Sequence, residues 1–205
     1  MAKHQGSHLY DGWLYHLVVD PVLAPARRLV RAQVRRGSAL IDMGCGTGAL
    51  LFALADRCSR LAGVERSGRM WDYGRRRAKA LGLGQIRFVH GDATQLHTFG
   101  DGSFDYASAT MVFHEMEPDK RLPLLMEMRR LASTLIIVDY RVPLPAGPSG
   151  LFIRFIESLA GGEHYRNFRS FVELGGISPL LVTQGFSVEE ELRLHGSSLQ
   201  LLRVR

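Results

Sequence analysis

The sequence is poor in cysteine: its two cysteines, Cys45 and Cys58, are too few for a disulfide framework or a cysteine-rich metal site. No apolar run reaches the roughly 18 residues that a membrane-spanning helix needs, and no signal-peptide pattern follows the start. Internal repeats and low-complexity segments are also absent. These absences predict a single folded domain over residues 1–205, without a membrane span, in the reducing cytoplasm.

The charge balance favours basic residues, with 26 Lys and Arg against 20 Asp and Glu, for a net charge of +6. Arginines gather within 27–36 and 75–77, which leaves an RNA-binding surface open as an interpretation. Because these clusters lie at helical spacing without interleaved aromatic residues, solvated helix faces are the favoured interpretation. Nucleic acid is therefore an alternative partner and not the expected one.

Strand and helix patterns alternate along nearly the whole chain, which predicts an α/β fold with a mainly parallel sheet. The predicted strands cover 39–43, 60–65, 86–92, 103–109 and 134–140, and the helices between them cover 48–58, 67–82 and 118–132. The Pro- and Gly-rich residues 141–150 predict a loop. The last thirty residues carry two strands joined across "HGS", which we expect to pair antiparallel at one edge of the sheet.

The stretch "LIDMGCGTGALL" (40–51) is typical of a loop that binds a nucleotide cofactor. Gly44, Gly46 and Ala49 fit the loose G-x-G-x-x-G/A fingerprint, so an NAD-dependent oxidoreductase is one alternative. Asp42 argues against a dinucleotide, because a carboxylate about 4 Å from a phosphate charge costs about 4 kcal/mol at an effective dielectric near 20. A ligand that carries an ammonium and a sulfonium group reverses this sign, and S-adenosylmethionine is such a ligand.

Acidic residues also end the next predicted strands, at the sheet edge where open α/β folds bind their ligands. Glu65 can accept hydrogen bonds from two ribose hydroxyls, and Asp92 can accept one from an adenine amino group. Either residue alone could equally cap the helix that follows it. Three such acids at consecutive strand ends favour a cofactor site.

The segments "LIDMGCGTG", "GVERS", "GDATQL" and "FDYASATMVFHEM" resemble, in order and spacing, the motifs of class I S-adenosylmethionine-dependent methyltransferases over residues 38–140. The resemblance implies a Rossmann-like, seven-stranded, mostly parallel sheet of order 3-2-1-4-5-7-6 with helices on both faces. It implies S-adenosylmethionine as the cofactor and S-adenosylhomocysteine as its product. The implied cofactor-binding residues are Tyr10, Asp42, Gly44, Cys45, Gly46, Gly48, Glu65, Arg66, Asp92, Ala93, Thr110 and Met111.

Within this family pattern, Asp42 and the glycines are expected to hold the methionine part, Glu65 the ribose, and Asp92 with Ala93 the adenine. The chain divides into an N-terminal helical lid (1–36), a cofactor-binding core (37–140) and an acceptor side with the terminal hairpin (141–205). "LYDGWLYHLVVDP" resembles the aromatic helix that covers the cofactor in such enzymes, so Tyr10 or Tyr15 is expected to contact it.

The segment after the fourth strand, "ATMVFHEME", lacks the Asn/Asp-Pro-Pro-aromatic run of nucleobase-amine methyltransferases, and both cysteines lie before it. "MVFHEM" instead resembles the "LHH"-type segment of small-molecule methyltransferases, including the quinone-biosynthesis branch. The expected acceptor is therefore a small, apolar or aromatic molecule, with RNA as the alternative. His114 and His164 are the candidate catalytic residues, no metal ligand is predicted, and a homodimer is left open.

The segment after the fifth strand is expected to shape the acceptor pocket. Alongside His164 it supplies five aromatic residues: Phe152, Phe155, Tyr165, Phe168 and Phe171. An apolar stripe also forms cores, so either location is open for these rings.

Overall fold

The computed structural model describes residues 21–159, 161–194 and 198–205. Tyr10 and Tyr15, with most of the predicted lid, lie outside these residues. Among the described residues, no helix combines the length and the apolar character that crossing a membrane requires.

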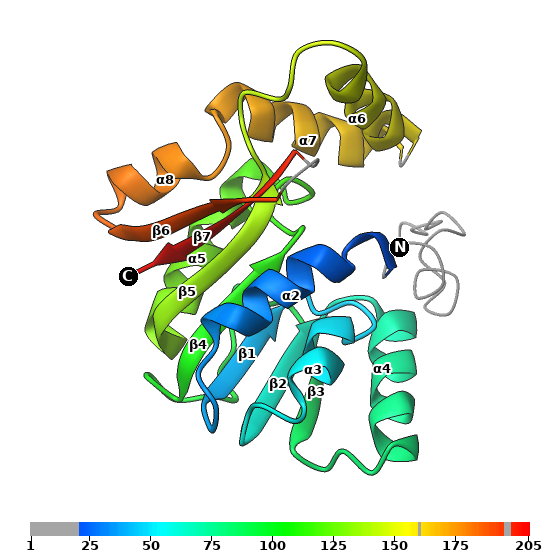
Figure 1. Ribbon diagram of the computed structural model, residues 1–205, viewed down its shortest axis with the longest axis vertical. Coiled ribbons are helices and arrows are strands. Elements are labelled where there is room, and N and C mark those ends of the chain that lie inside the picture. Colours follow the sequence, from blue (N-terminus) through cyan, green and yellow to red (C-terminus); the bar gives the residue numbers. More distant parts are fainter. Residues whose placement is uncertain (1–20, 160, 195–197) are drawn as a thin grey trace.

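Seven strands form one sheet of order β3-β2-β1-β4-β5-β7-β6, which confirms the predicted order (Figure 1). The strands are β1 (Ala39–Met43), β2 (Arg60–Glu65), β3 (Ile86–His90), β4 (Phe104–Thr110), β5 (Ala132–Tyr140), β6 (Val188–Arg193) and β7 (Leu199–Val204). The first five strands pair in parallel, whereas β7 runs antiparallel to both β5 and β6. The terminal hairpin is therefore confirmed, with its second strand inserted next to β5.

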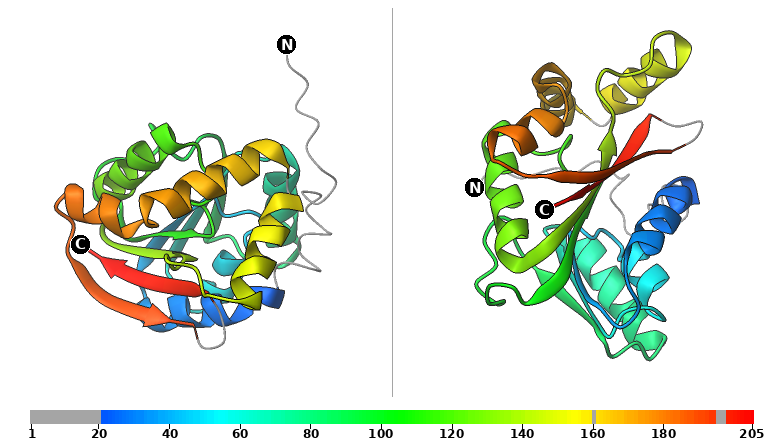
Figure 2. Two further views of the ribbon diagram at one scale, coloured as in Figure 1. Left: turned by 90° about the horizontal axis from the view of Figure 1, so that it is seen from above. Right: turned by 60° about the vertical axis from the view of Figure 1, so that its left-hand side comes forward.

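Helices cover both faces of the sheet (Figures 1 and 2). One face packs against α2 (Ala24–Gln33), α3 (Ala49–Leu54) and α4 (Gly68–Ala80). The other face packs against α5 (Pro118–Leu131), α7 (Gly162–Leu174) and α8 (Ser178–Thr183). Helix α6 (Pro148–Leu159) lies against α7 beyond the carboxyl end of the sheet.

Several boundaries differ from the sequence prediction; for example, the strand expected over 86–92 ends at His90. The helix expected over 48–58 ends at Leu54, and α6 begins at Pro148, inside the predicted loop 141–150. A proline in the first turn of a helix costs nothing, because that turn lacks partners for its N–H groups. The Pro- and Gly-rich signal therefore marked the start of α6 as well as a loop.

Strand β1 lies at the centre of the sheet and is buried on both faces. Leu40 packs with the α2–α4 side, whereas Ile41 and Met43 pack with the α5–α8 side. Since parallel strands covered on both faces are apolar throughout, a charged residue in β1 is an exception that needs a local explanation. Asp42 is that exception, at an exposed fraction of 3%.

Candidate active site

The loop after β1 folds back against the end of β2. The amide of Cys45 donates to the Val64 carbonyl oxygen at 2.9 Å, and the amide of Gly46 donates to Glu65 Oε2 at 2.9 Å. The amide of Gly48 then donates to the Cys45 carbonyl oxygen at 2.8 Å, and α3 begins directly afterwards. These bonds hold the loop at the carboxyl edge of the sheet, where the sequence predicted it.

Two glycines of this loop are required by the protein's own packing. Gly44 and Gly48 have φ angles of +70° and +81°, a region that disfavours residues with a Cβ. A Cβ at Gly48 would lie 2.5 Å from Phe88 Cζ, and one at Gly44 would lie 2.8 Å from Val112 Cγ2. Contacts with neighbouring side chains therefore require glycine at both positions.

Asp42 belongs to β1, and its side chain is buried beside the neighbouring strand β4. Its register partner is Ser108, whose Oγ donates to Asp42 Oδ1 at 2.7 Å. Burial, together with the nearby negative charge of Glu65, raises the pKa of Asp42 to about 7, although the hydrogen bond from Ser108 opposes this shift. Since no cationic side chain of the described residues pairs with it, this carboxyl group is suited to a ligand that brings a positive charge.

The other two predicted acids are held by main-chain amides. Glu65 Oε1 accepts from the Ser67 amide at 2.7 Å, in addition to the bond from Gly46 to Oε2. Asp92 Oδ1 accepts from the amide and the hydroxyl of Thr94, and the amide bond is the main cause of a lowered pKa of Asp92. Both carboxylates are therefore fixed at the strand ends.

The remaining predicted cofactor residues lie at the same edge. Thr110 ends β4, and its Oγ1 is buried without a hydrogen-bond partner among the described residues. Met111 follows with a φ of +58°, which costs a residue with a side chain about 1–2 kcal/mol, and such strain concentrates at functional sites. Arg66 is exposed and Ala93 half-buried beside their acidic neighbours. Burial strongly raises the pKa of the Cys45 thiol, which makes it a poor nucleophile.

His114 lies buried at the end of this edge, at the centre of a polar cluster. Its Nδ1 is 2.7 Å from Asp139 Oδ1, and its amide also donates to Asp139 Oδ2. Burial opposes a charge on the imidazole, but the carboxylates of Asp139, Glu115 and Glu157 outweigh it and raise the pKa of His114 to about 9. These carboxylates therefore favour a positive charge at this position.

His164 joins the same cluster from α7. Its Nε2 lies 2.5 Å from Glu157 Oε2, and Tyr140 donates its hydroxyl to Glu157 Oε1 at 2.7 Å. The two histidine rings are 6.0 Å apart between centroids. The structure thus brings both candidate catalytic histidines together, although they are separated by fifty positions in the sequence.

Aromatic rings surround His114 on the acceptor side. The centroid of its ring lies 4.9 Å from that of Tyr140 and 6.4 Å from those of Phe168 and Phe171. In contrast, Phe152 and Phe155 on α6 are 61% and 59% exposed. Of the rings in this segment, Phe168 and Phe171 of α7 therefore lie near His114, whereas Phe152 and Phe155 of α6 are exposed.

Three residues of the site were not assigned roles from the sequence. Ser108 contacts Asp42 through the strand register, Asp139 binds His114, and Glu157 binds His164 and Tyr140. Asp139 carried a signal, because it ends the fifth predicted strand at the ligand edge. Ser108 and Glu157 carried none, since their contacts depend on register and on helix placement.

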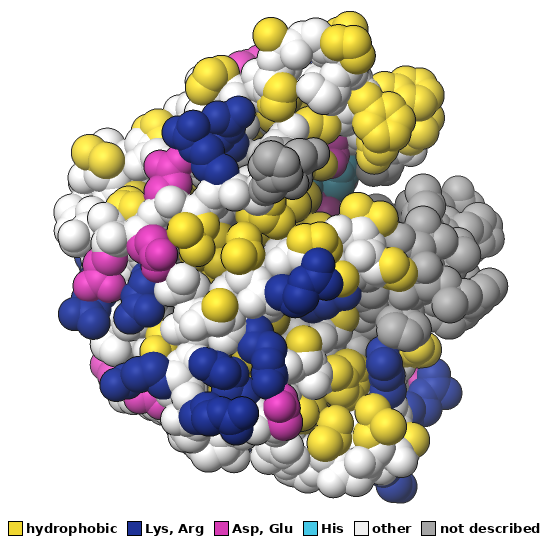
Figure 3. Space-filling model, viewed as in Figure 1, with side chains coloured by type: hydrophobic (Ala, Val, Ile, Leu, Met, Phe, Trp, Pro, Cys, Tyr) yellow, Lys and Arg dark blue, Asp and Glu magenta, His cyan; other side chains and the backbone are white. Residues whose placement is uncertain are grey.

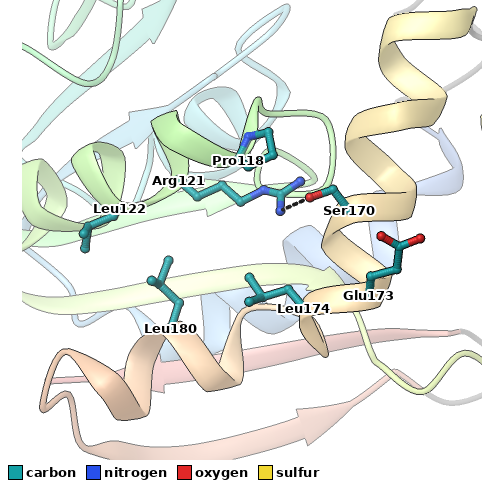
Figure 4. A pocket seen from close by; sticks show the side chains of 7 residues that line it. All are labelled: Pro118, Arg121, Leu122, Ser170, Glu173, Leu174 and Leu180. Atoms are coloured by element: carbon teal, nitrogen blue, oxygen red, sulfur yellow. Dashed lines mark hydrogen bonds between the residues drawn. The ribbon is translucent and has the colours of Figure 1, made fainter.

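A separate hollow of about 360 Å³ lies between α5, α7 and α8, and Figure 4 shows the side chains that line it. Arg121 crosses its wall, 2% exposed, and donates to the carbonyl oxygens of Phe113, Met116 and Asn167. It also donates to Ser170 Oγ. None of the predicted site residues lines this hollow. Through its hydrogen bonds, Arg121 connects α5 with α7 and with the segment after β4.

Comparison with known proteins places the sequence among methyltransferases. A family model described as a methyltransferase domain matches residues 40–134. The demethylmenaquinone methyltransferase of Geobacillus kaustophilus (strain HTA426) is 35% identical over 104 residues, which cover 49% of this chain and 43% of that protein. The demethylmenaquinone methyltransferase of Clavibacter sepedonicus is 32% identical over 181 residues, which cover 82% of this chain and 73% of that protein. The chain thus spans less than half the length of the first relative.

A solved structure gives the same fold. The mitomycin 7-O-methyltransferase MmcR superposes with a TM-score of 0.71 at 22% identity, over 94% of this chain and 56% of that one. At this level of identity the similarity establishes the fold alone.

Proposed function

Because the chain belongs to the class I S-adenosylmethionine-dependent methyltransferase family, we propose that it transfers a methyl group from S-adenosylmethionine to a small acceptor of apolar or aromatic character. The family relation supports the cofactor, and the surroundings of His114 support the kind of acceptor. The relatives named as demethylmenaquinone methyltransferases favour a quinone-type ring. A cytoplasmic location and a homodimer stay predictions from the sequence.

The observation that carries the proposal is the buried carboxyl group of Asp42 beside a glycine-rich loop. A carboxyl group with a pKa of about 7 gains a partner when the ammonium of the cofactor's methionine part arrives. Glu65 and Asp92 offer acceptor oxygens for the ribose and the adenine, and the buried hydroxyl of Thr110 still lacks a partner among the described residues. The residues present therefore fit the cofactor.

The cofactor supplies an electrophilic methyl group, so the chain's own task is to align the acceptor and to exclude water. The rings of Tyr140, Phe168 and Phe171 form an apolar wall next to His114 that suits an aromatic acceptor. His114 and His164 are the residues we assign to position its polar atoms.

Calorimetric titration tests the cofactor assignment. S-adenosylmethionine should bind the wild-type chain, and Asp42→Asn should weaken that binding by about 1–3 kcal/mol, since it removes a charged hydrogen-bond partner. Asp101→Asn is the matched control, because Asp101 is an exposed acid that pairs with Arg130 and lies just before the amino-terminal end of β4. Binding of NADH without binding of S-adenosylmethionine would instead support the oxidoreductase alternative.

Turnover tests the acceptor. Formation of S-adenosylhomocysteine should require an apolar hydroquinone or phenol and should not be stimulated by bulk transfer RNA or ribosomal RNA. Turnover with RNA alone would replace the small acceptor with nucleic acid.

A further inference from the structure

Two histidines and two glutamates from separate elements converge beyond the ends of β4 and β5. His114 and Glu115 follow β4, Glu157 belongs to α6, and His164 belongs to α7. One ligand atom from each of His114, Glu115 and His164 lies within 4.8 Å of the other two. Figure 3 shows histidine and acidic side chains together in a hollow below the upper helices.

His114 Nε2 makes no direct hydrogen bond to either glutamate of this cluster. His114 Nε2 lies 3.8 Å from Glu115 Oε1 and 3.9 Å from Glu157 Oε1, beyond the range of a hydrogen bond. Two ligand atoms that share a tetrahedral cation at about 2.1 Å are about 3.4 Å apart. His114 and Glu115 would therefore need to approach by a few tenths of an ångström to share a cation, and ligand atoms at the 4.8 Å limit of this cluster by about 1.4 Å.

Each histidine is also oriented by a buried carboxylate. His114 Nδ1 lies against Asp139, which leaves Nε2, the atom 3.8 Å from Glu115 Oε1, for another ligand, and His164 Nε2 lies against Glu157. Pairs of a carboxylate and a histidine of this kind fix the ring and its tautomer in metal sites. The proximity of Asp139, Glu157 and Glu115 also supplies negative charge for a cation.

We propose that His114, Glu115 and His164 bind a divalent transition-metal cation such as Zn²⁺, with Asp139 and Glu157 orienting the two imidazoles. Imidazole and carboxylate ligands suit this class of cation. The Glu115 side chain is 41% exposed, so the cation can enter from solvent.

Three protein ligands leave a coordination position open, as in catalytic zinc sites. An oxygen atom of the acceptor fits that position. This last assignment rests on the proposed methyl transfer, whereas binding of the metal does not.

A calorimetric titration of the chelator-treated full chain with Zn²⁺ alone tests the site. We expect one cation per chain at this site, and both His164→Gln and Glu115→Gln should weaken its binding at least about tenfold. His97→Gln is the matched control, because His97 is an exposed histidine outside the cluster. Thermal unfolding without metal checks that the variants fold, and Zn²⁺ should raise the midpoint of the wild type by more than that of His164→Gln.

The chain also carries His4, His8 and His16, so a triple His→Gln variant at these positions must keep the zinc binding. Absence of binding, binding that survives both His164→Gln and Glu115→Gln, or binding that is lost in the triple variant would overturn the metal site. Because no cofactor or acceptor is present in this titration, failure of the proposed methyl transfer would leave its result unchanged.

Discussion

Asp42 stands at the end of a strand that is buried on both faces, so its carboxylate loses most of its hydration. Ser108 returns one hydrogen bond, but Glu65 adds negative charge nearby, and the pKa of Asp42 rises to about 7. A folded-state pKa above the unfolded value means that this group favours folding at low pH and loses that contribution as pH rises from about 4 to about 7. A bound ammonium group reverses the preference, because it stabilises the ionised form.

This sign predicts the pH dependence of cofactor binding. Below about pH 7 the Asp42 carboxyl must release a proton before it pairs with the ammonium group, so affinity for S-adenosylmethionine should fall by up to about tenfold per pH unit. Above that pH the affinity should level off until the α-amino group of the cofactor loses its proton, at about pH 7.7–8.0. Calorimetry between pH 5.5 and 8.5, roughly a unit and a half on each side of that pKa, measures this. Asp42→Asn should flatten the curve, and an equally steep curve in that variant would remove Asp42 as the cause.

Comparison of Gly37 with Gly48 separates two costs of replacing a glycine: backbone strain and crowding of the new side chain. Gly37→Ala should cost about 1–2 kcal/mol of unfolding free energy from its φ of +79° alone, since open space surrounds the new Cβ. Gly48→Ala combines φ of +81° with a contact at 2.5 Å to Phe88 Cζ and should cost more. Urea unfolding of both variants measures the difference, and equal losses would show that Phe88 yields freely.

At the scale of elements, the site depends on where α6 and α7 lie relative to the end of the sheet. Glu157 and His164 reach His114 only because these helices cross beyond the ends of β4 and β5. Arg121 connects the framework below them, since its guanidinium binds carbonyl oxygens of the segment after β4 and of α7.

Replacement of Arg121 should lower the free energy of unfolding considerably. Arg121→Met leaves three carbonyl oxygens without their charged donor, so we expect the free energy of unfolding to fall by at least about 3 kcal/mol. Arg169→Met is the control, because Arg169 forms an exposed ion pair with Glu173 whose loss should cost at most about 1 kcal/mol. Denaturant unfolding compares the two. Similar small losses would mean that water replaces the guanidinium.

At the scale of the whole molecule, the net charge is +6, but several of the arginines form ion pairs with nearby acids. Arg31 binds Asp56, and Arg75 and Arg76 both contact Asp72, so members of both arginine clusters are neutralised locally. Figure 3 shows Lys and Arg side chains spread over this face among acidic and apolar ones. This distribution agrees with the interpretation of solvated helix faces.

Salt dependence tests that interpretation. Methyl transfer to a neutral small acceptor should change by less than roughly twofold between 50 and 200 mM salt, whereas binding through 6–10 phosphate contacts would weaken about 10³- to 10⁵-fold. Initial rates at saturating cofactor measure the first quantity, and RNA retention on filters measures the second. Tight RNA binding with that steep slope would assign the arginines to a nucleic-acid surface.

The sequence by itself determined the alternation of strands and helices, the glycine loop and the acids at the strand ends, because local patterns and short spacings specify them, whereas the strand order was implied by the resemblance to the methyltransferase family. Asp42, Glu65 and Asp92 could be found in this way, since parallel strands bring their carboxyl ends to one edge. Only the tertiary structure decided that Ser108 meets Asp42, that α7 and not α6 supplies the rings near His114, and that His164 lies beside His114. Those contacts join residues far apart in the chain, and they depend on strand register and helix packing, for which the local pattern carries no signal.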